Sequence, residues 1–160
     1  MEEFPGNISL RKRVGVIGGN SPGPDSMRAA EKMGELIAES GYVLVNGGMG
    51  GIMEASAKGA KKLGGFVVSI LPGDSPSSGN SYSDMAIVTG LGYIRNPLVV
   101  LNSDILVAID GSYGTLSEIA YAKIYHKKVL GLKTWDIEGV EECSDPGEVI
   151  NKIRNYFGAA

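Results

Sequence analysis

Hydrophobic and polar positions follow two patterns along the chain, and these patterns predict strands and helices in turn. Runs that are almost continuously apolar predict strands at residues 14–17, 42–45, 66–70, 105–109 and 127–132, with a weaker run at 85–88. Segments with apolar residues on one side predict helices at residues 27–38, 52–63, 95–102, 116–125 and 148–157. Strands this apolar are buried on both faces. The chain therefore predicts an α/β fold, a doubly wound, mainly parallel sheet with helices on both faces.

The length of 160 residues fits one domain with its own core, so we treat residues 1–160 as a single domain. Residues 1–9 show no period and predict a loosely held tail. Residues 71–82 combine proline, glycine and four serines. Because too little chain follows them for a second domain, we interpret them as a mobile loop near the site rather than a linker. Residues 135–146 are expected to be irregular.

Glycine makes up 24 of the 160 residues, about twice its usual share, and it gathers where the apolar runs end. Glycine-bearing turns at residues 18–23, 47–51 and 111–114 directly follow predicted strands. The carboxyl ends of parallel strands meet at one edge of the sheet, where ligands of such folds bind. In the first two turns the candidate ligand contacts are Gly19, Asn20, Ser21, Gly47 and Gly48.

The third turn lies within residues 110–118 and is the strongest candidate for the centre of the site. An apolar strand leads into it and an amphipathic helix leaves it, so the turn stands at the start of a helix. A helix start has unpaired N–H groups and the positive end of the helix dipole, and glycine allows close backbone approach. The pattern predicts a phosphate site with these candidate contacts: Gly111, Ser112, Tyr113, Gly114 and Thr115.

Three side chains near this turn have interpretations that the sequence leaves open. Glu118 either contacts the ligand or completes a capping box with Thr115 at the start of its own helix. Arg95 either clamps a phosphate or carboxylate or forms a surface ion pair. Tyr113 either is exposed or covers a bound ligand.

Composition argues against several classes of function. The net charge is −3 without a basic block, so electrostatics give no reason to expect nucleic-acid binding. With one cysteine and one histidine, we expect no disulfide within the chain and no metal site. No apolar stretch reaches the roughly 18 residues of a membrane span and no secretion signal is present, so we expect a cytoplasmic protein without membrane contact. The turns also lack the P-loop lysine and the Gly-x-Gly-x-x-Gly fingerprint of NAD dehydrogenases.

Three motifs together resemble the LOG-like, Rossmann-type family, whose members were long labelled lysine decarboxylases. The motifs are Asn46-Gly47-Gly48, Arg95-Asn96 and Gly111-Ser112-Tyr113-Gly114-Thr115-Leu116-Ser117-Glu118, and the likeness covers about residues 14–132. It implies a Rossmann-like fold and a homodimer or higher homo-oligomer. Characterised members are phosphoribohydrolases that release the base from cytokinin nucleoside 5′-monophosphates, and a neighbouring subgroup resembles molybdenum-cofactor carrier proteins. The decarboxylase label has no support here, because the sequence lacks the pyridoxal phosphate constellation that it needs.

The resemblance also implies roles for individual residues. Carried onto this chain, the family signature makes Gly111, Gly114 and Thr115 the phosphate contacts. It makes Arg95 and Glu118 the catalytic pair.

This chain departs from the family signature at three positions. Asp110 stands where proline is usual, Ser112 where a glycine is usual, and Asn96 where lysine is usual. A carboxylate facing a phosphate is unfavourable. Either Asp110 points away from the ligand, or the ligand is not a simple nucleoside monophosphate.

Two functions of different classes follow. The first is a nucleotide-binding phosphoribohydrolase that cleaves the N-glycosidic bond of a nucleoside 5′-monophosphate and requires no cofactor. The alternative is a non-catalytic protein that binds or carries a nucleotide or the molybdenum cofactor, and a sensor of nucleotide occupancy is a third. In each case the expected partner is a small-molecule nucleotide or phosphate. The helices at 27–38 and 148–157 either cover a contact between copies or pack the core.

Overall fold

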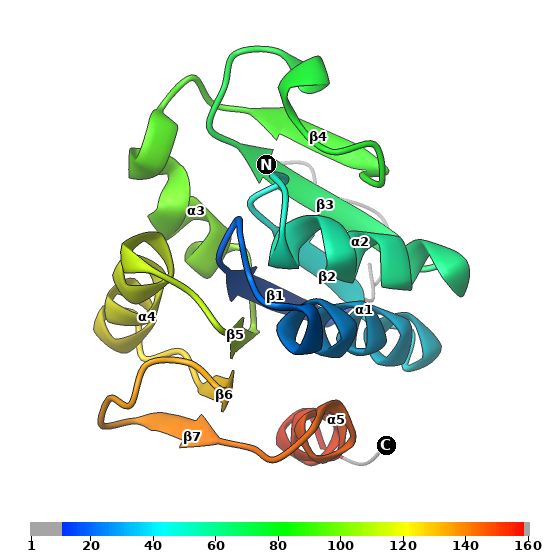
Figure 1. Cartoon of the computed structure of the whole chain (residues 1–160), viewed down its shortest axis with the longest axis vertical. Coiled ribbons are helices and arrows are strands. Elements are labelled where there is room, and N and C mark those ends of the chain that lie inside the picture. The colour runs from blue at the N-terminus through cyan, green and yellow to red at the C-terminus, as the bar shows by residue number, and fades with distance from the viewer. Residues whose placement is uncertain (1–10, 159–160) are drawn as a thin grey trace, which may run out of the picture.

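The computed structural model describes residues 11–158, which form a seven-stranded sheet between two layers of helices (Figure 1). The tail expected at residues 1–9 lies outside the described residues. The strands, in chain order, are β1 (Arg13–Gly18), β2 (Val43–Asn46), β3 (Phe66–Leu71), β4 (Met85–Val88), β5 (Ile105–Ile109), β6 (Val129–Leu132) and β7 (Val140–Glu142). Their order in the sheet is β4-β3-β2-β1-β5-β6-β7, and every neighbouring pair is parallel. The predicted α/β, Rossmann-like class is therefore confirmed.

Helices cover both faces of the sheet, as the apolar strands require. The elements are α1 (Pro24–Glu39), α2 (Ile52–Lys62), α3 (Asn96–Leu101), α4 (Tyr113–Ile124) and α5 (Pro146–Tyr156), with short 3-10 helices η1 (Pro76–Ser78) and η2 (Gly92–Arg95). Helices α1, α2 and α5 pack on one face, and α3 and α4 pack on the other (Figure 1). Helices α1 and α5 contribute buried apolar side chains to the first layer, among them Ile37 and Ile153, and a contact between copies at these helices stays a prediction.

Two glycines allow α1 and α2 to pack closely. A Cβ built on Gly34 in α1 would collide with the backbone carbonyl of Ser56, and a Cβ on Gly59 in α2 would collide with that of Glu31. Because each glycine faces the backbone of the other helix, α1 and α2 meet backbone to backbone.

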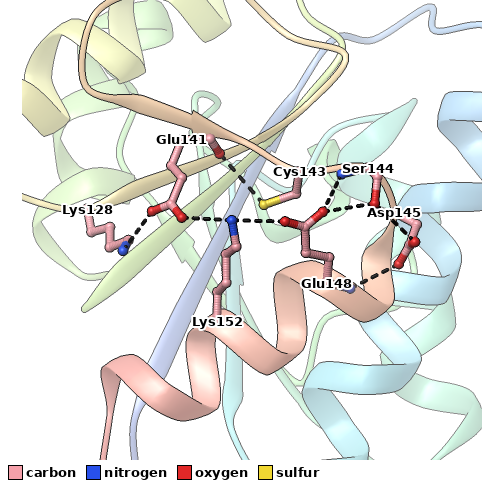
Figure 2. A network of polar contacts seen from close by, with 7 residues as sticks. All are labelled: Lys128, Glu141, Cys143, Ser144, Asp145, Glu148 and Lys152. Atoms are coloured by element: carbon pink, nitrogen blue, oxygen red, sulfur yellow. Dashed lines mark hydrogen bonds and ion pairs between the residues drawn. The ribbon is translucent and has the colours of Figure 1, made fainter.

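One segment differs from its expectation. Residues 135–146 were expected to be irregular, yet they contain β7 at the edge of the sheet. This strand has three residues, two of them glutamates, so it lacks the apolar pattern of the inner strands. Figure 2 shows how side chains hold it: the Glu141 carboxylate lies 2.8 Å from Lys128 Nζ and 2.7 Å from Lys152 Nζ. Lys152 also pairs with Glu148 of α5 at 2.9 Å, which joins the edge strand to that helix.

The loop expected near the site is anchored to it. The Asn80 backbone N–H donates to the Gly48 carbonyl at 2.8 Å, and its side-chain amide donates to the Met49 carbonyl at 3.0 Å. The 71–82 loop therefore lies against the turn that follows β2.

Candidate functional site

The site lies where the strand order reverses. Strands β1 and β5 are neighbours, but the chain leaves β1 toward α1 on one face and β5 toward α4 on the other. Such a switch point leaves a crevice at the carboxyl ends of the two strands. A cavity of about 640 Å³ opens there.

The glycine-bearing turns meet at this cavity, as the sequence predicted. The backbone N–H of Ile52, which follows the second turn, donates to the Gly19 carbonyl of the first turn at 3.0 Å. A Cβ on Gly19 would lie 3.6 Å from the Cα of Gly111 in the third turn. The cavity is lined by residues from all three turns, from α2, η2, α3 and α4, and from the loop after β3: Gly18, Gly19, Asn20, Met49, Met53, Pro72, Gly92, Tyr93, Arg95, Asn96, Ser112, Tyr113, Gly114, Thr115, Ser117 and Glu118.

Eight of the predicted site residues line the cavity: Gly19, Asn20, Arg95, Ser112, Tyr113, Gly114, Thr115 and Glu118. Four others, Ser21, Gly47, Gly48 and Gly111, do not line it. The Gly48 N–H donates to Asn46 Oδ1 at 2.9 Å, and the Gly111 N–H donates to Asp110 Oδ1 at 2.7 Å. These two amides therefore stabilise their own turns, and ligand contact by any of the twelve residues stays a prediction.

Helix α4 presents its first turn to the cavity. The helix begins at Tyr113 with Ser112 at the N-cap, and no side chain caps it. Within residues 11–158, the N–H groups of Tyr113, Gly114 and Thr115 have no hydrogen-bond acceptor. These three residues line the cavity, so their amides are available to an anion.

The position of this helix start excludes the capping-box interpretation of Glu118. Thr115 lies inside the helix rather than at its N-cap. Glu118 is buried, with 7% of its surface exposed, and lines the cavity. Burial raises the pKa of its carboxyl to about 8, although the nearby positive charge of Arg95 opposes the shift. In the free protein Glu118 is therefore mostly protonated at neutral pH.

Arg95 is also buried, which excludes a surface ion pair. It ends η2 with 6% of its surface exposed. Its guanidinium donates to the Ile70 carbonyl at 2.8 Å, to the Gly47 carbonyl at 3.0 Å, and to Asn96 Oδ1. Burial lowers the pKa of Arg95, while the Glu118 charge opposes this. Three of its five N–H groups are used by the protein, which leaves donors for a ligand.

Asn96 connects the arginine to the helix start. Its Oδ1 accepts from Arg95, and its Nδ2 donates to Ser117 Oγ at 2.9 Å. Ser117 Oγ in turn donates to the Gly114 carbonyl at 2.6 Å. From the sequence, Asn96 was notable only as a departure from the family signature. The structure shows that it connects Arg95 to the start of α4.

Asp110 is turned toward its own loop. Its φ is +54°, a left-handed conformation that is uncommon for a residue with a side chain. Its carboxylate accepts the Gly111 N–H, and its backbone carbonyl accepts from Thr134 Oγ1 at 2.7 Å. Asp110 does not line the cavity. Of the two alternatives left open, the structure shows the one in which Asp110 points away.

Sequence reasoning missed the apolar side of the cavity. Met49, Met53, Pro72 and Tyr93 contribute to it. Met49 was visible inside a glycine turn and Pro72 in the loop beside the site. Nothing in the sequence singled out Tyr93, whose position depends on how η2 packs.

Residues 11–158 contain neither a cluster of metal ligands nor a membrane-spanning helix. No group of three or more His, Cys, Asp or Glu side chains in this part of the chain is placed to hold a metal ion. None of its helices has the length and apolar character needed to cross a membrane.

Comparison with known proteins gives consistent matches. The sequence pattern of the SLOG cluster4 family matches residues 11–155. An uncharacterised protein of Archaeoglobus fulgidus is 47% identical over 87% of this chain and 92% of its own length. A cytokinin riboside 5′-monophosphate phosphoribohydrolase of Arabidopsis thaliana is 28% identical over 93% of this chain and 72% of its own. The solved structure of the molybdenum cofactor binding protein of Rippkaea orientalis superposes with a TM-score of 0.89 at 34% identity. That match covers 93% of this chain and 99% of the other.

Proposed function

Because the chain belongs to the SLOG cluster4 family, we propose that it binds a nucleoside 5′-monophosphate and hydrolyses its N-glycosidic bond. The family match confirms the LOG-like resemblance of the sequence. One observation carries the proposal. The unpaired amides of the first turn of α4 open into the same cavity as a buried arginine and a buried carboxylic acid. We also propose that the protein acts in the cytoplasm.

The phosphate is the anchor of the proposed complex. It accepts hydrogen bonds from the N–H groups of Tyr113, Gly114 and Thr115, at the positive end of the α4 dipole. The spare N–H groups of Arg95 add a fixed positive charge. This binding holds the ribose within reach of Glu118, which lies on the next turn of the same helix.

Glu118 performs the proton transfers. As the bond between C1′ and the base nitrogen breaks, the nitrogen keeps the electron pair and takes the proton of the Glu118 carboxyl. Water then adds to C1′ and gives its proton to the Glu118 carboxylate, which restores the acid. The products are the free base and ribose 5-phosphate. A pKa near 8 suits the first step, because the carboxyl begins the reaction protonated.

A second candidate is a non-catalytic carrier of the molybdenum cofactor. It is favoured by the likeness to the Rippkaea orientalis protein, which covers nearly the whole of both chains. The cofactor is then cargo, with its phosphate at the α4 amides and its pterin ring on the apolar side of the cavity. Asn96, in place of the family's usual lysine, also distinguishes this chain from the hydrolase signature.

The test is to incubate the protein with AMP and with a cytokinin riboside 5′-monophosphate and to measure the released base by chromatography. We expect release by the wild type and a loss of about 100-fold or more in Glu118→Gln. The matched control is Glu54→Gln, an exposed glutamate in the first turn of α2, which should keep wild-type release. If AMP raises the melting temperature but no base appears with either substrate, the hydrolase is wrong and the carrier is favoured. If AMP neither binds nor is cleaved, nucleotide binding itself is wrong.

A further inference from the structure

The cavity is lined by polar and by apolar groups, and only the polar groups are explained by phosphate binding. The α4 amides, Arg95 and Glu118 are the polar groups. Met49, Met53 and Pro72 are apolar groups, which have no partner in an inorganic phosphate or a bare sugar phosphate.

Two tyrosines border this cavity from different elements. Tyr93 belongs to η2 and Tyr113 is the first residue of α4, and their side chains are 78% and 79% exposed. Neither ring contributes to the buried core. Single exposed aromatic residues are ordinary. Two large rings that both line one cavity are instead typical of a surface that a ligand covers.

The two rings lie beside the proposed phosphate position. A Cβ placed on Gly114 would be 3.9 Å from Cε1 of Tyr93. Glycine therefore leaves no side chain between the Tyr93 ring and the first turn of α4. Tyr113 is the residue before Gly114 in that turn, so both rings lie near the amides that we assign to the phosphate.

The exposed ring of Tyr113 packs beside the ring of Trp135. Its ring centroid lies 6.0 Å from that of Trp135, at an interplanar angle of 36°. Trp135 is itself fixed, because its indole N–H donates to the Ser112 carbonyl at 3.2 Å. Such support lowers the entropy that the ring would lose on contact with a ligand.

We propose that Tyr93 and Tyr113 form a stacking surface for the planar heterocycle of a phosphorylated ligand. This inference rests on the proposed function, and it defines the ligand class as a phosphate ester that carries a flat aromatic ring, either a nucleotide base or a pterin. Stacking recognises the face of a ring rather than its edge. The surface therefore accepts rings of both kinds.

The experiment measures affinity by calorimetry for AMP, neopterin monophosphate and ribose 5-phosphate, which has no ring. All proteins carry Glu118→Gln, so that AMP is not consumed. Tyr93→Leu and Tyr113→Leu keep apolar bulk but remove the aromatic face. Tyr156→Leu is the matched control, since Tyr156 is an exposed tyrosine on α5, on the opposite face of the sheet.

We expect each cavity variant to bind the ring ligands about fivefold or more weakly and to bind ribose 5-phosphate within about twofold of its parent. Tyr156→Leu should bind all three ligands like the parent. In the Glu118→Gln parent, AMP should change the emission of Trp135, the single tryptophan, and ribose 5-phosphate should not. A loss with AMP alone or with neopterin monophosphate alone supports the surface and identifies which ring it takes.

Two results overturn the stacking surface while the phosphate site stands. The first is unchanged affinity for both ring ligands in both variants. The second is an equal loss for ribose 5-phosphate, which would place the tyrosines at the phosphate instead. If the parent and the wild type bind none of the three ligands, the proposed function fails, and this inference fails with it.

Discussion

Glu118 shows at the scale of one residue how burial determines chemistry. Unfolding returns its pKa from about 8 to about 4.5. Between these values the unfolded chain has released a proton that the folded chain keeps, so the stability contributed by Glu118 falls as the pH rises from 4.5 to 8. Above pH 8 it remains at its lowest value.

Glu118→Gln should therefore stabilise the free protein. We expect its free energy of unfolding to exceed that of the wild type by about 1 to 4 kcal/mol at pH 8.5, with little difference at pH 4.5. Urea denaturation at a series of pH values measures this. Glu54→Gln, which replaces an exposed glutamate, is the control variant for the substitution itself. A Glu118→Gln curve parallel to the wild-type curve would show that Glu118 titrates normally.

Asn96 allows a second prediction, because it is buried and connects Arg95 to α4. Asn96→Ala removes the acceptor of one Arg95 N–H and the amide that donates to Ser117 Oγ. We expect a loss of about 1 to 3 kcal/mol in the free energy of unfolding and weaker AMP binding. The control is Asn102→Ala, which removes an exposed side chain that donates only to the Leu98 carbonyl. Equal melting temperatures for the two variants would contradict the connecting role.

The sequence identified these residues better than it identified their roles. Arg95 and Glu118 were candidates because they stand beside a glycine turn. Their burial depends on η2, α3 and α4 packing over the sheet, which no local pattern encodes. Gly47 and Gly48 were recognisable in the sequence as part of a glycine-bearing turn. The sequence could not show that they do not line the cavity, because this also depends on how the elements pack.

At the scale of elements, the contact between α1 and α2 depends on small residues. Gly34→Ala places a methyl group against the Ser56 carbonyl, and since that atom belongs to a helix backbone it cannot turn aside. We expect a loss of about 1 to 3 kcal/mol or more in the free energy of unfolding. Gly23→Ala, directly before the same helix, is the control, because its Cβ meets no atom within 4 Å and its φ is −68°. Denaturation of both variants tests this, and equal stability would mean that the helices separate at little cost.

Elements with strong local patterns were predicted within a few residues, and those held by tertiary contacts were not. The inner strands are apolar along their whole length because helices cover both of their faces. Strand β7 is short and is fixed by pairing with β6 and by the lysines that hold Glu141 (Figure 2). Helix α4 begins three residues before its expected start. The sequence pointed to Thr115 as the N-cap, and Tyr113 and Gly114 carry no signal that marks an earlier start. That early start is what brings the Tyr113 and Gly114 amides into the site.

At the scale of the whole molecule, the surface formed by η2, α3 and α4 is apolar. Helix α3 has no charged residue. Helix α4 has apolar residues on its outer side as well as on the side that faces the core. The exposed apolar residues include Ile94 on η2, Leu101 on α3, Ile124 on α4 and Tyr125 at the C-cap of α4. A helix that is apolar all round is normally covered on both sides. Helices α1 and α5, by contrast, bury most of their apolar side chains in the core of the chain.

The family resemblance implies a homo-oligomer and points to no surface of α3 or α4. From the exposed apolar residues we propose that a second copy of the chain covers this α3–α4 surface. Lys123 is the one exposed charged residue within α4, and its ammonium group donates to the Gly139 carbonyl at 3.1 Å, so α3 and α4 present few charges to a second copy. We expect a dimer or higher oligomer by light scattering, and Ile124→Lys should shift it toward the monomer without unfolding it. The control is Leu63→Lys, which changes an exposed leucine at the end of α2 and should leave the assembly intact. Because Tyr113 begins α4, loss of the dimer should also alter AMP affinity if the partner borders the cavity. A monomeric wild type at micromolar concentration would contradict the proposal.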